Sequence, residues 1–389
     1  MKPLVGFAEL PFGKPFINRQ VDIISLSQGS SSLYVQDRHG KNRRGSKQWR
    51  FKTWSAEIVL LSSIHTASER RNEILPNWQN LFSAPQLPDV LKDAHCWRLP
   101  LTRHDATLVQ STRQNAMAER TADVQAHWTR PGVLARIDAA LTELGHDPQK
   151  LNPEILATVE HLHSGGLATT REQAKRIALT EDSRVLDVGC GIGGPARYLA
   201  HSYGCRVDGI DLTAELIETG RMLTERCGLA DRVVLQIGNA LDLPYPDQTF
   251  DVVWCQNVAM NIADKDGLFA GVYRALKPGG LFTSTEYSVG PGGDIIFPVP
   301  WAYDASINFL DPEDMMRPRY HTAGFRILEC MNYSNTVIEH YERMLSAPPK
   351  LTSRLIFGDD APERQRNSQR NLIERRTIYW MITAERPKL

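Results

Sequence analysis

The clearest pattern in the chain is an alternation of short apolar runs and amphipathic stretches that begins near residue 184. Apolar runs bounded by turn residues predict strands, and apolar residues spaced three or four apart predict helices. The expected strands lie at 185–188, 206–210, 233–237, 251–255, 281–286, 325–328 and 377–383. The expected helices lie at 194–203, 214–227 and 268–276. This alternation predicts an α/β fold whose mostly parallel sheet is covered by helices on both faces.

Three further helices are expected before the alternating region. The first carries apolar residues at helical spacing from Leu134 to Leu144 and ends at Gly145. The second begins at Asn152-Pro153, a capping residue followed by a first-turn proline. A capping box formed by Thr169 and Glu172 predicts the start of the third. These segments indicate a helical cap at 117–180 in front of a larger domain at 181–389.

Residues 1–116 show no sustained periodicity. Residues 56–64 alone resemble a buried strand, and residues 38–52 contain seven basic and no acidic side chains. Three interpretations stay open: a poorly ordered extension created by an upstream start codon, an organelle-targeting presequence, and a small accessory domain. We expect a poorly ordered or accessory extension.

Composition is typical of a soluble globular protein, with 42% hydrophobic and 23% charged residues among 389. No apolar run is long enough to span a membrane, and the first residues lack the pattern of a secretory signal. The six cysteines form no C-x-x-C pair, and the histidines show no metal-binding spacing. We therefore expect reduced thiols, a cytoplasmic location and no metal site.

The balanced net charge hides an asymmetry between the two parts of the chain. Residues 1–116 carry 16 basic and 9 acidic side chains, which leaves 29 basic and 36 acidic for residues 117–389. An acidic domain has no long-range attraction for nucleic acid, so a polynucleotide partner is not expected. The oligomeric state stays open.

The most informative motif is Asp-Val-Gly-Cys-Gly-Ile-Gly-Gly at 187–194, at the end of the first expected strand. Glycines there allow a tight turn and close approach of a ligand to the backbone. Asp211 ends the second strand, where a carboxylate can accept hydrogen bonds from both hydroxyls of a ribose. The spacing also satisfies the G-x-G-x-x-G fingerprint of NAD-binding proteins, so an oxidoreductase competes as an interpretation.

Three features disfavour that competitor. Asp187 lies two residues before the first glycine, where an acid suits an amine-bearing cation and would repel a pyrophosphate. Gly238-Asn239-Ala240 follows the third strand, where an adenine ring could be held. The third feature is that three further segments, at 243–251, 252–256 and 276–280, follow one another along the chain after these residues. The expected cofactor-binding residues are Asp187, Gly189, Gly191, Asp211, Leu212, Asn239, Ala240 and Gln256.

Taken together, these motifs resemble the class I, S-adenosylmethionine (SAM) dependent methyltransferases of the type 11 group. The run at 187–200 is most similar to sarcosine/dimethylglycine N-methyltransferases and also resembles tocopherol and sterol C-methyltransferases. Residues 161–166 resemble the D-x-F-H-x-G-G segment that precedes the first strand in such enzymes. The resemblance covers about residues 127–385 and implies a Rossmann-like sheet of seven strands, the last pair antiparallel.

The resemblance implies that a methyl group passes from SAM to a small-molecule acceptor, on nitrogen, carbon or oxygen. The alternatives are an NAD-dependent oxidoreductase and a SAM-binding protein without catalysis. Candidate catalytic residues are His163, Asn257 and Tyr303, and Trp301 and Tyr287 could join Tyr303 in a cage for a methylated ammonium. Two positions depart from the family pattern, because Asn239 replaces a common acid and Asn257 replaces a common histidine.

Overall fold

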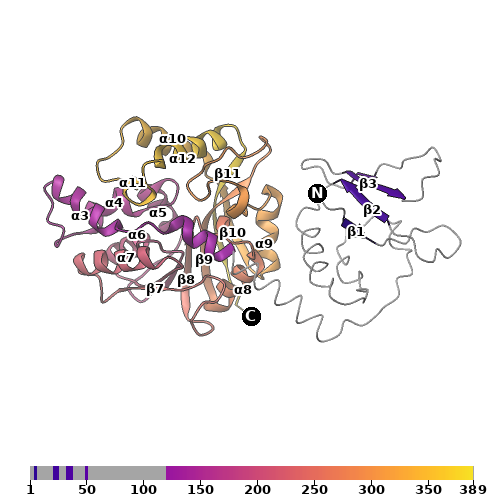
Figure 1. Cartoon of the computed structure of the whole chain (residues 1–389). Coiled ribbons are helices and arrows are strands. Elements are labelled where there is room, and N and C mark those ends of the chain that lie inside the picture. The colour runs from indigo at the N-terminus through magenta and orange to yellow at the C-terminus, as the bar shows by residue number, and fades with distance from the viewer. Residues whose placement is uncertain (1–3, 7–20, 26–31, 38–48, 51–119, 389) are drawn as a thin grey trace, which may run out of the picture. The chain divides into compact units, whose positions relative to one another are not determined.

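The computed structural model describes residues 4–6, 21–25, 32–37, 49–50 and 120–388 (Figure 1). The chain divides into two compact units, Met1–Asn115 and Ala116–Leu389. In the first unit, four short strands form a sheet in sequence order. They are β1 (Leu4–Gly6), β2 (Val21–Ser25), β3 (Ser32–Asp37) and β4 (Trp49–Arg50), each antiparallel to its neighbour. The strand expected at 56–64 lies outside the described residues.

The second unit is built on a seven-stranded sheet with the order β10-β11-β9-β8-β5-β6-β7. The strands β5 to β9 are parallel, and β11 runs antiparallel to both of its neighbours. The strand bounds are β5 (Arg184–Val188), β6 (Arg206–Asp211), β7 (Val233–Ile237), β8 (Phe250–Gln256), β9 (Leu276–Val289), β10 (Arg326–Asn332) and β11 (Thr377–Glu385). The predicted α/β fold with seven strands is confirmed.

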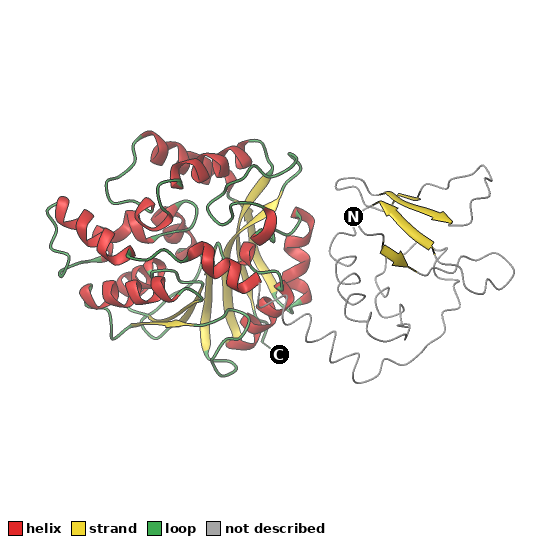
Figure 2. Cartoon of the chain, in the orientation of Figure 1, coloured by secondary structure: helices red, strands yellow, loops and turns green. Residues whose placement is uncertain are grey.

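Helices cover the sheet on both faces (Figure 2). Their bounds are α3 (Val133–Glu143), α4 (Pro153–Glu160), α5 (Gly166–Ala174), α6 (Gly194–Tyr203), α7 (Ala214–Arg226), α8 (Lys265–Ala275), α9 (Met316–Thr322), α10 (Ser334–Ser346), α11 (Arg354–Phe357) and α12 (Ala361–Ile373). A further helical stretch occupies residues 120–128. Within the described part of the chain, no helix combines the length and the apolar character needed to cross a membrane.

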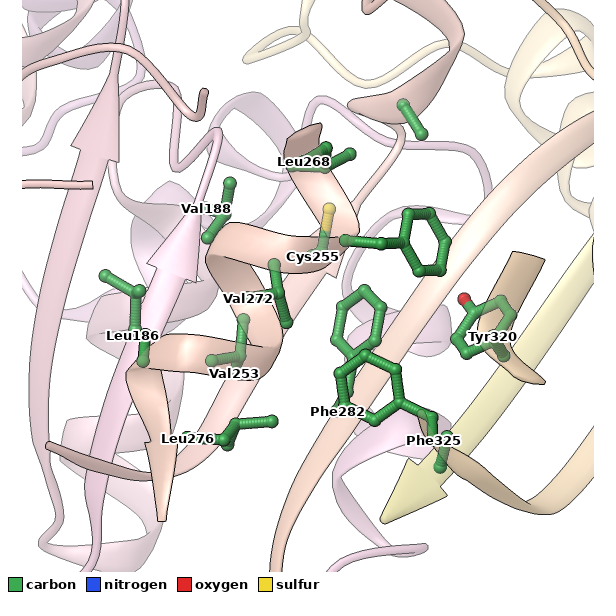
Figure 3. Packing of buried hydrophobic residues seen from close by; sticks show 14 of the residues in the cluster. Leu186, Val188, Val253, Cys255, Leu268, Val272, Leu276, Phe282, Tyr320 and Phe325 are labelled. Atoms are coloured by element: carbon green, nitrogen blue, oxygen red, sulfur yellow. The ribbon is translucent and has the colours of Figure 1, made fainter. Parts of the chain in front are cut away.

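Alternate residues of the strands feed two hydrophobic cores, as the two-residue period of a strand requires. On β8, Val253 and Cys255 pack with α8 and α9, whereas Val252 and Trp254 pack with α6 and α7. Figure 3 shows the first of these cores, in which Phe282 stacks on Tyr320 at 5.5 Å between ring centroids. Both faces of the strands are therefore buried, which explains their near-continuous apolar sequences.

Two predicted boundaries are wrong. Helix α5 begins at Gly166 and not at the predicted capping box, because Gly165 provides the N-cap in the left-handed region, at φ 86°. Thr169 therefore lies inside the helix, where its side chain is buried. Strand β9 begins at Leu276 and runs through the Lys-Pro-Gly-Gly segment that was expected to end a helix. A shift in the pairing of β8 with β9 accommodates that segment.

Helices α10 to α12 follow β10 and were not predicted. They bring residues 334–373 back over the carboxyl edge of the sheet, because the cavity there includes residues of all three helices. Figure 1 shows α10 and α12 side by side above the sheet. They pack through a fourth core that contains Val337, Tyr341 and Leu372.

We expect a protein that starts at Met117 to fold on its own. All four described hydrophobic cores consist of residues from 124 onward, so removal of the first 116 residues takes no side chain from them. Circular dichroism should show one cooperative thermal transition, and calorimetry should show unchanged cofactor binding. Aggregation or loss of binding would mean that the N-terminal unit is needed for the stability of the second.

Candidate active site

A cavity of about 520 Å³ opens at the carboxyl edge of the sheet. The strands β6 and β7 follow β5 on one side of it, and β8 then pairs with β5 on its other side. The loops after β5 and β8 therefore diverge and leave a crevice, which is where open α/β sheets bind ligands. All eight residues expected to bind the cofactor line this cavity: Asp187, Gly189, Gly191, Asp211, Leu212, Asn239, Ala240 and Gln256.

The glycine turn after β5 requires backbone conformations that other residues rarely adopt. Gly189 and Gly191 have φ of 71° and 55°. A Cβ atom on Gly189 would collide with the side chain of Val258, which lies on the opposite wall. The turn is held by Asp211, whose carboxylate accepts hydrogen bonds from the backbone N–H of Gly191 at 3.0 Å and of Thr213 at 2.9 Å. Asp211 thus fixes the shape of the turn as well as lining the cavity.

Asp187 is a buried acid in the cavity wall. Its side chain is buried, and its Oδ2 atom has no hydrogen-bond partner among the described residues. Burial, together with repulsion from Asp211, raises the pKa of Asp187 well above its ordinary value. A buried carboxyl without a partner is costly in isolation, so this position suits a ligand that brings a cation or hydrogen-bond donors.

Asn239 follows β7 and takes the place of the acid that the resemblance led us to expect. Its Oδ1 atom accepts a hydrogen bond from the backbone N–H of Leu241 at 2.9 Å, which shapes the loop. Ala240, next to it, lines the cavity with a small apolar side chain. The loop therefore offers a narrow, mostly uncharged wall of the kind that can hold a flat ring.

A buried network of polar side chains joins Gln256 to His163. Gln256 donates to Gln173 at 2.9 Å and accepts from Thr170 at 3.4 Å. The Nε2 atom of His163 lies 3.0 Å from both Thr170 Oγ1 and the carbonyl oxygen of Gly166. A contact with a carbonyl oxygen places the proton on Nε2 and leaves Nδ1 unprotonated.

Burial lowers the pKa of His163 to about 3, against the raising effect of the Gly166 carbonyl. The imidazole is therefore neutral at physiological pH and is a weak proton acceptor. The neighbouring His161 is also buried, and desolvation lowers its pKa well below the ordinary value. Both rings thus act on the cavity through shape and hydrogen bonding, not through charge.

Asn257 lies where β8 ends and adopts a left-handed backbone conformation, with φ 56°. Its side chain accepts a hydrogen bond from the hydroxyl of Tyr379 at 2.7 Å and donates to Ser164 at 3.4 Å. Ser164 in turn bonds to the hydroxyls of Tyr287 at 2.7 Å and Tyr341 at 3.0 Å. Both tyrosine hydroxyls also reach Ser368, which closes a ring of four hydroxyl groups.

The hydroxyl ring was missed by sequence reasoning, because its members lie far apart in the chain. Ser164, Tyr341 and Asn257 line the cavity and bring the ring to its floor. A hydroxyl that donates one bond and accepts one within the ring keeps a second lone pair. Ser164 uses that lone pair for Asn257, so the Tyr341 hydroxyl is the ring member at the cavity that can accept a hydrogen bond from a ligand.

The aromatic cage expected from Tyr287, Trp301 and Tyr303 does not form. Trp301 lines the cavity and stacks on Tyr287 at 4.6 Å between ring centroids, but Tyr287 is buried behind it and does not line the cavity. Tyr303 lies outside the cavity and is 47% exposed. Its hydroxyl accepts a hydrogen bond from Arg130 at 2.7 Å, and the guanidinium of Arg364 lies over its ring. Trp301 and Tyr303 lie two positions apart, with the first side chain buried at the cavity and the second exposed outside it.

The rest of the cavity is lined largely by apolar side chains that only the fold brings together. They come from the helical stretch at 120–128, from the segment before α8, from the connection between β9 and α9, and from α10 and α11: Val124, Trp128, Met260, Ile262, Phe309, Met344 and Phe357. The side chain of Asn261 connects the parts of this wall. It accepts a hydrogen bond from the indole of Trp128 at 3.2 Å and donates hydrogen bonds to the carbonyl oxygens of Trp301 and Ile307. Among the described residues, no group of three or more His, Cys, Asp or Glu side chains is placed to hold a metal ion.

Comparison with known proteins identifies the central part of the chain. Residues 186–284 match a family model of type 11 that is described as a methyltransferase domain. Phosphoethanolamine N-methyltransferase 3 of Arabidopsis thaliana is 39% identical over 128 residues, which are 33% of this chain and 26% of that protein. The glycine/sarcosine/dimethylglycine N-methyltransferase of Actinopolyspora halophila is 28% identical over 219 residues, 55% of this chain and 38% of that protein. The chain thus spans well under half the length of both relatives.

The fold of the second unit also occurs in solved structures. The geranyl diphosphate C-methyltransferase of Streptomyces coelicolor A3(2) superposes with a TM-score of 0.52 at 18% identity. The match covers 69% of this chain and 98% of that one. At this identity the likeness shows the fold alone. Together with the family model, it confirms the resemblance to class I methyltransferases on which the sequence analysis settled.

Proposed function

We propose that this chain, which carries a type 11 methyltransferase domain at residues 186–284, transfers the methyl group of SAM to a small-molecule acceptor. The observation that carries the proposal is the position of two carboxyls beside the glycine turn. Asp187 and Asp211 line the same end of the cavity, and the pKa of Asp187 is raised by burial and by Asp211. An acidic end of this kind suits a ligand that carries positive charge and repels the pyrophosphate of NAD.

The residues present fit SAM. Asp187 would face the amino group of the methionine part, and Asp211 would hold the ribose hydroxyls with the lone pairs that its two backbone contacts leave free. Asn239, Ala240 and Leu212 would border the adenine. When bound, SAM supplies a methyl group activated by a sulfonium. The chain contributes positioning of the two reactants and exclusion of water, which are the main requirements of such a displacement.

The proposed acceptor is small and partly apolar. Its part of the cavity is walled by apolar side chains and ends on the hydroxyl ring at Ser164 and Tyr341. The names of the relatives support small acceptors, since they refer to phosphoethanolamine and to glycine, sarcosine and dimethylglycine. A nitrogen, carbon or oxygen atom of that acceptor receives the methyl group.

As part of the same proposal, we place the enzyme in the cytoplasm without a nucleic-acid partner. The five cysteines of the described residues are free thiols, which suits a reducing compartment. The excess of 36 acidic over 29 basic side chains in residues 117–389 disfavours a polyanion as the general partner of this domain.

The test is release of S-adenosylhomocysteine by the full chain with a panel of acceptors. The panel contains small amines, phenols and isoprenoids, together with the acceptors named for the relatives. Turnover with a small molecule would establish the activity. Binding of SAM without release for any acceptor would favour a non-catalytic SAM-binding protein. Efficient methylation of RNA, DNA or protein alone would contradict the small-molecule assignment.

Binding of SAM is expected to release a proton from Asp187. Burial and repulsion from Asp211 raise the pKa of Asp187 in the free protein, and a bound cation would lower that pKa again. The affinity for SAM should therefore increase as the pH rises towards the pKa that Asp187 has in the free protein. Calorimetry in buffers of different ionisation enthalpy measures the proton directly.

The matched control is Glu286, a second buried carboxyl whose pKa burial raises to about 8 but which does not line the cavity. Asp187→Asn should abolish the buffer dependence of the binding enthalpy, and Glu286→Gln should retain it. Equal proton release in the parent protein and in Asp187→Asn would show that Asp187 is not the group that titrates.

His163 and Tyr303 should differ in their effect on turnover. His163→Ala removes a cavity side chain and one end of the Thr170–Gln256 network, so kcat/KM should fall at least about tenfold while SAM affinity changes little. Tyr303→Ala should leave kcat/KM unchanged and lower thermal stability, because Tyr303 contacts Arg130 and Arg364 outside the cavity. Steady-state kinetics with thermal melts would decide, and a large loss of kcat/KM in Tyr303→Ala would place that residue in the acceptor site.

A further inference from the structure

A second groove, of about 880 Å³, lies beside the cavity and is lined by basic side chains. Its walls come from the start of α3, from α11 and α12, and from the connection between α10 and α11. Five cationic side chains and one carboxylate line it: Arg130, Arg136, Lys350, Arg354, Arg366 and Asp359. This concentration of positive charge contrasts with the acidic balance of residues 117–389 as a whole.

Hydrogen bonds fix part of this basic lining in place. Arg136 donates to the carbonyl oxygens of Leu355 at 2.8 Å and Pro131 at 2.7 Å, which holds its guanidinium at the groove wall. Arg354 pairs with Asp359 at 2.7 Å and so neutralises the one carboxylate of the lining. Arg130 also lies 3.9 Å from Asp360, so the unbalanced positive charge of the groove comes from Arg136, Lys350 and Arg366.

Lys350 and Arg366 are different, because they are exposed and have no hydrogen bond or ion pair with any described residue. No existing hydrogen bond or ion pair among the described residues has to be broken when their charged ends turn towards a ligand. An anion in the groove would meet two free cations and the fixed guanidinium of Arg136. Charge-assisted contacts to phosphate oxygens are among the stronger hydrogen bonds in proteins.

The groove and the cavity share a wall. Met344, Pro349 and Gln365 line both of them. From the cavity to the groove the charged lining changes from acidic to basic. Asp187 and Asp211 lie at the cofactor end, and the basic side chains line the groove. A molecule that extends from the apolar part of the cavity past Met344 would reach the cationic side chains.

We propose that the basic groove binds the phosphate or diphosphate group of the methyl acceptor, whose remaining part lies in the cavity. The inference rests on the proposed function, and it adds a substrate class and a binding site to it. A multiply charged phosphate matches a lining with five cations and one paired carboxylate better than a single carboxylate would. The groove would thereby select phosphorylated acceptors over their uncharged counterparts.

The first test measures binding of inorganic pyrophosphate to the full chain by calorimetry, without SAM. The double variant Lys350→Ala, Arg366→Ala removes the two free cations and breaks no contact within the described residues. It should weaken pyrophosphate binding at least tenfold, and the parent affinity should fall as salt is added. Arg317→Ala is the control, because the Arg317 side chain is also exposed, forms no hydrogen bond or ion pair within residues 120–388, and does not line the groove. Absent binding, or equal binding by the parent and the double variant, would overturn the proposal.

The second test compares acceptors with and without a phosphate, such as ethanolamine with phosphoethanolamine and geraniol with geranyl diphosphate. The double variant should raise KM at least tenfold for the phosphorylated acceptor that is turned over, leave kcat unchanged, and leave SAM affinity unchanged. Unchanged KM would show that an anion bound in the groove is not part of the acceptor, which also overturns the proposal. Because pyrophosphate is titrated without SAM, failure of SAM binding would count against the proposed function and not against the groove.

Discussion

Asp211→Ala is expected to weaken SAM binding by about 2–4 kcal/mol, or roughly 30- to 700-fold in Kd. Two charge-assisted hydrogen bonds to the ribose would be lost, less some replacement by water. The structure adds a second contribution, because the same carboxylate holds the N–H groups of Gly191 and Thr213. Loss of these contacts would loosen the glycine turn as well.

The control for this change is Asp208→Ala, three residues earlier on the same strand. Asp208 pairs with Arg184 at 3.1 Å and does not line the cavity. Its removal should leave SAM affinity within about twofold of the parent, since partly exposed ion pairs contribute little. Calorimetry that gave equal affinities for the parent and Asp211→Ala would remove Asp211 from the cofactor site.

Loss of either partner in the ion pair of Glu160 and Arg197 should destabilise the fold by about 3–5 kcal/mol. Both side chains are fully buried, and Arg197 donates to Glu160 Oε2 at 2.7 Å. Arg197 also donates to the carbonyl oxygen of Gly220 and to Thr224, so it ties the end of α4 to α6 and α7. Arg197→Met would leave a buried carboxylate without its cation, and Glu160→Met would leave the reverse. Thermal melts should show Tm lowered by roughly 6–20 °C.

Two comparisons separate the buried pair from a general loss of charge. Glu339→Gln breaks the pair with Arg343, whose side chains are each 65% exposed at 4.0 Å, and should change stability by less than about 1 kcal/mol. The double variant Glu160→Met, Arg197→Met should be more stable than either single variant, because no uncompensated charge remains. A double variant that lost the sum of the two single effects would show that the two residues act independently.

The cofactor side of the cavity could be predicted from the sequence because its residues follow strands directly. Asp187 is the penultimate residue of β5 and Asp211 is the last residue of β6, and parallel strands present their carboxyl ends at one edge of the sheet. The predicted strands therefore place the motif residues together at that edge of the sheet. The glycines of the turn are a second local indication of the site. Gly189 has a φ of 71°, a backbone conformation that residues other than glycine rarely adopt.

The acceptor side could not be predicted in this way, because its residues come from separate segments that only the packing of helices joins. Trp128 and Phe357 are more than 200 residues apart, yet their rings lie 5.6 Å apart between centroids. Tyr341 contacts Ser164 because α10 packs back over the sheet, and no local sequence pattern predicts that packing. Conversely, Trp301 and Tyr303 are only two positions apart in sequence, but Trp301 lines the cavity and Tyr303 does not.

The central claim is that the cavity at the carboxyl edge of the sheet is a SAM site. Titration of S-adenosylhomocysteine, and separately of NADH, into the full chain by isothermal calorimetry tests it most directly. We expect saturable binding of one S-adenosylhomocysteine per chain and no measurable heat with NADH. Tight binding of NADH with no binding of S-adenosylhomocysteine would contradict the claim and restore the oxidoreductase interpretation.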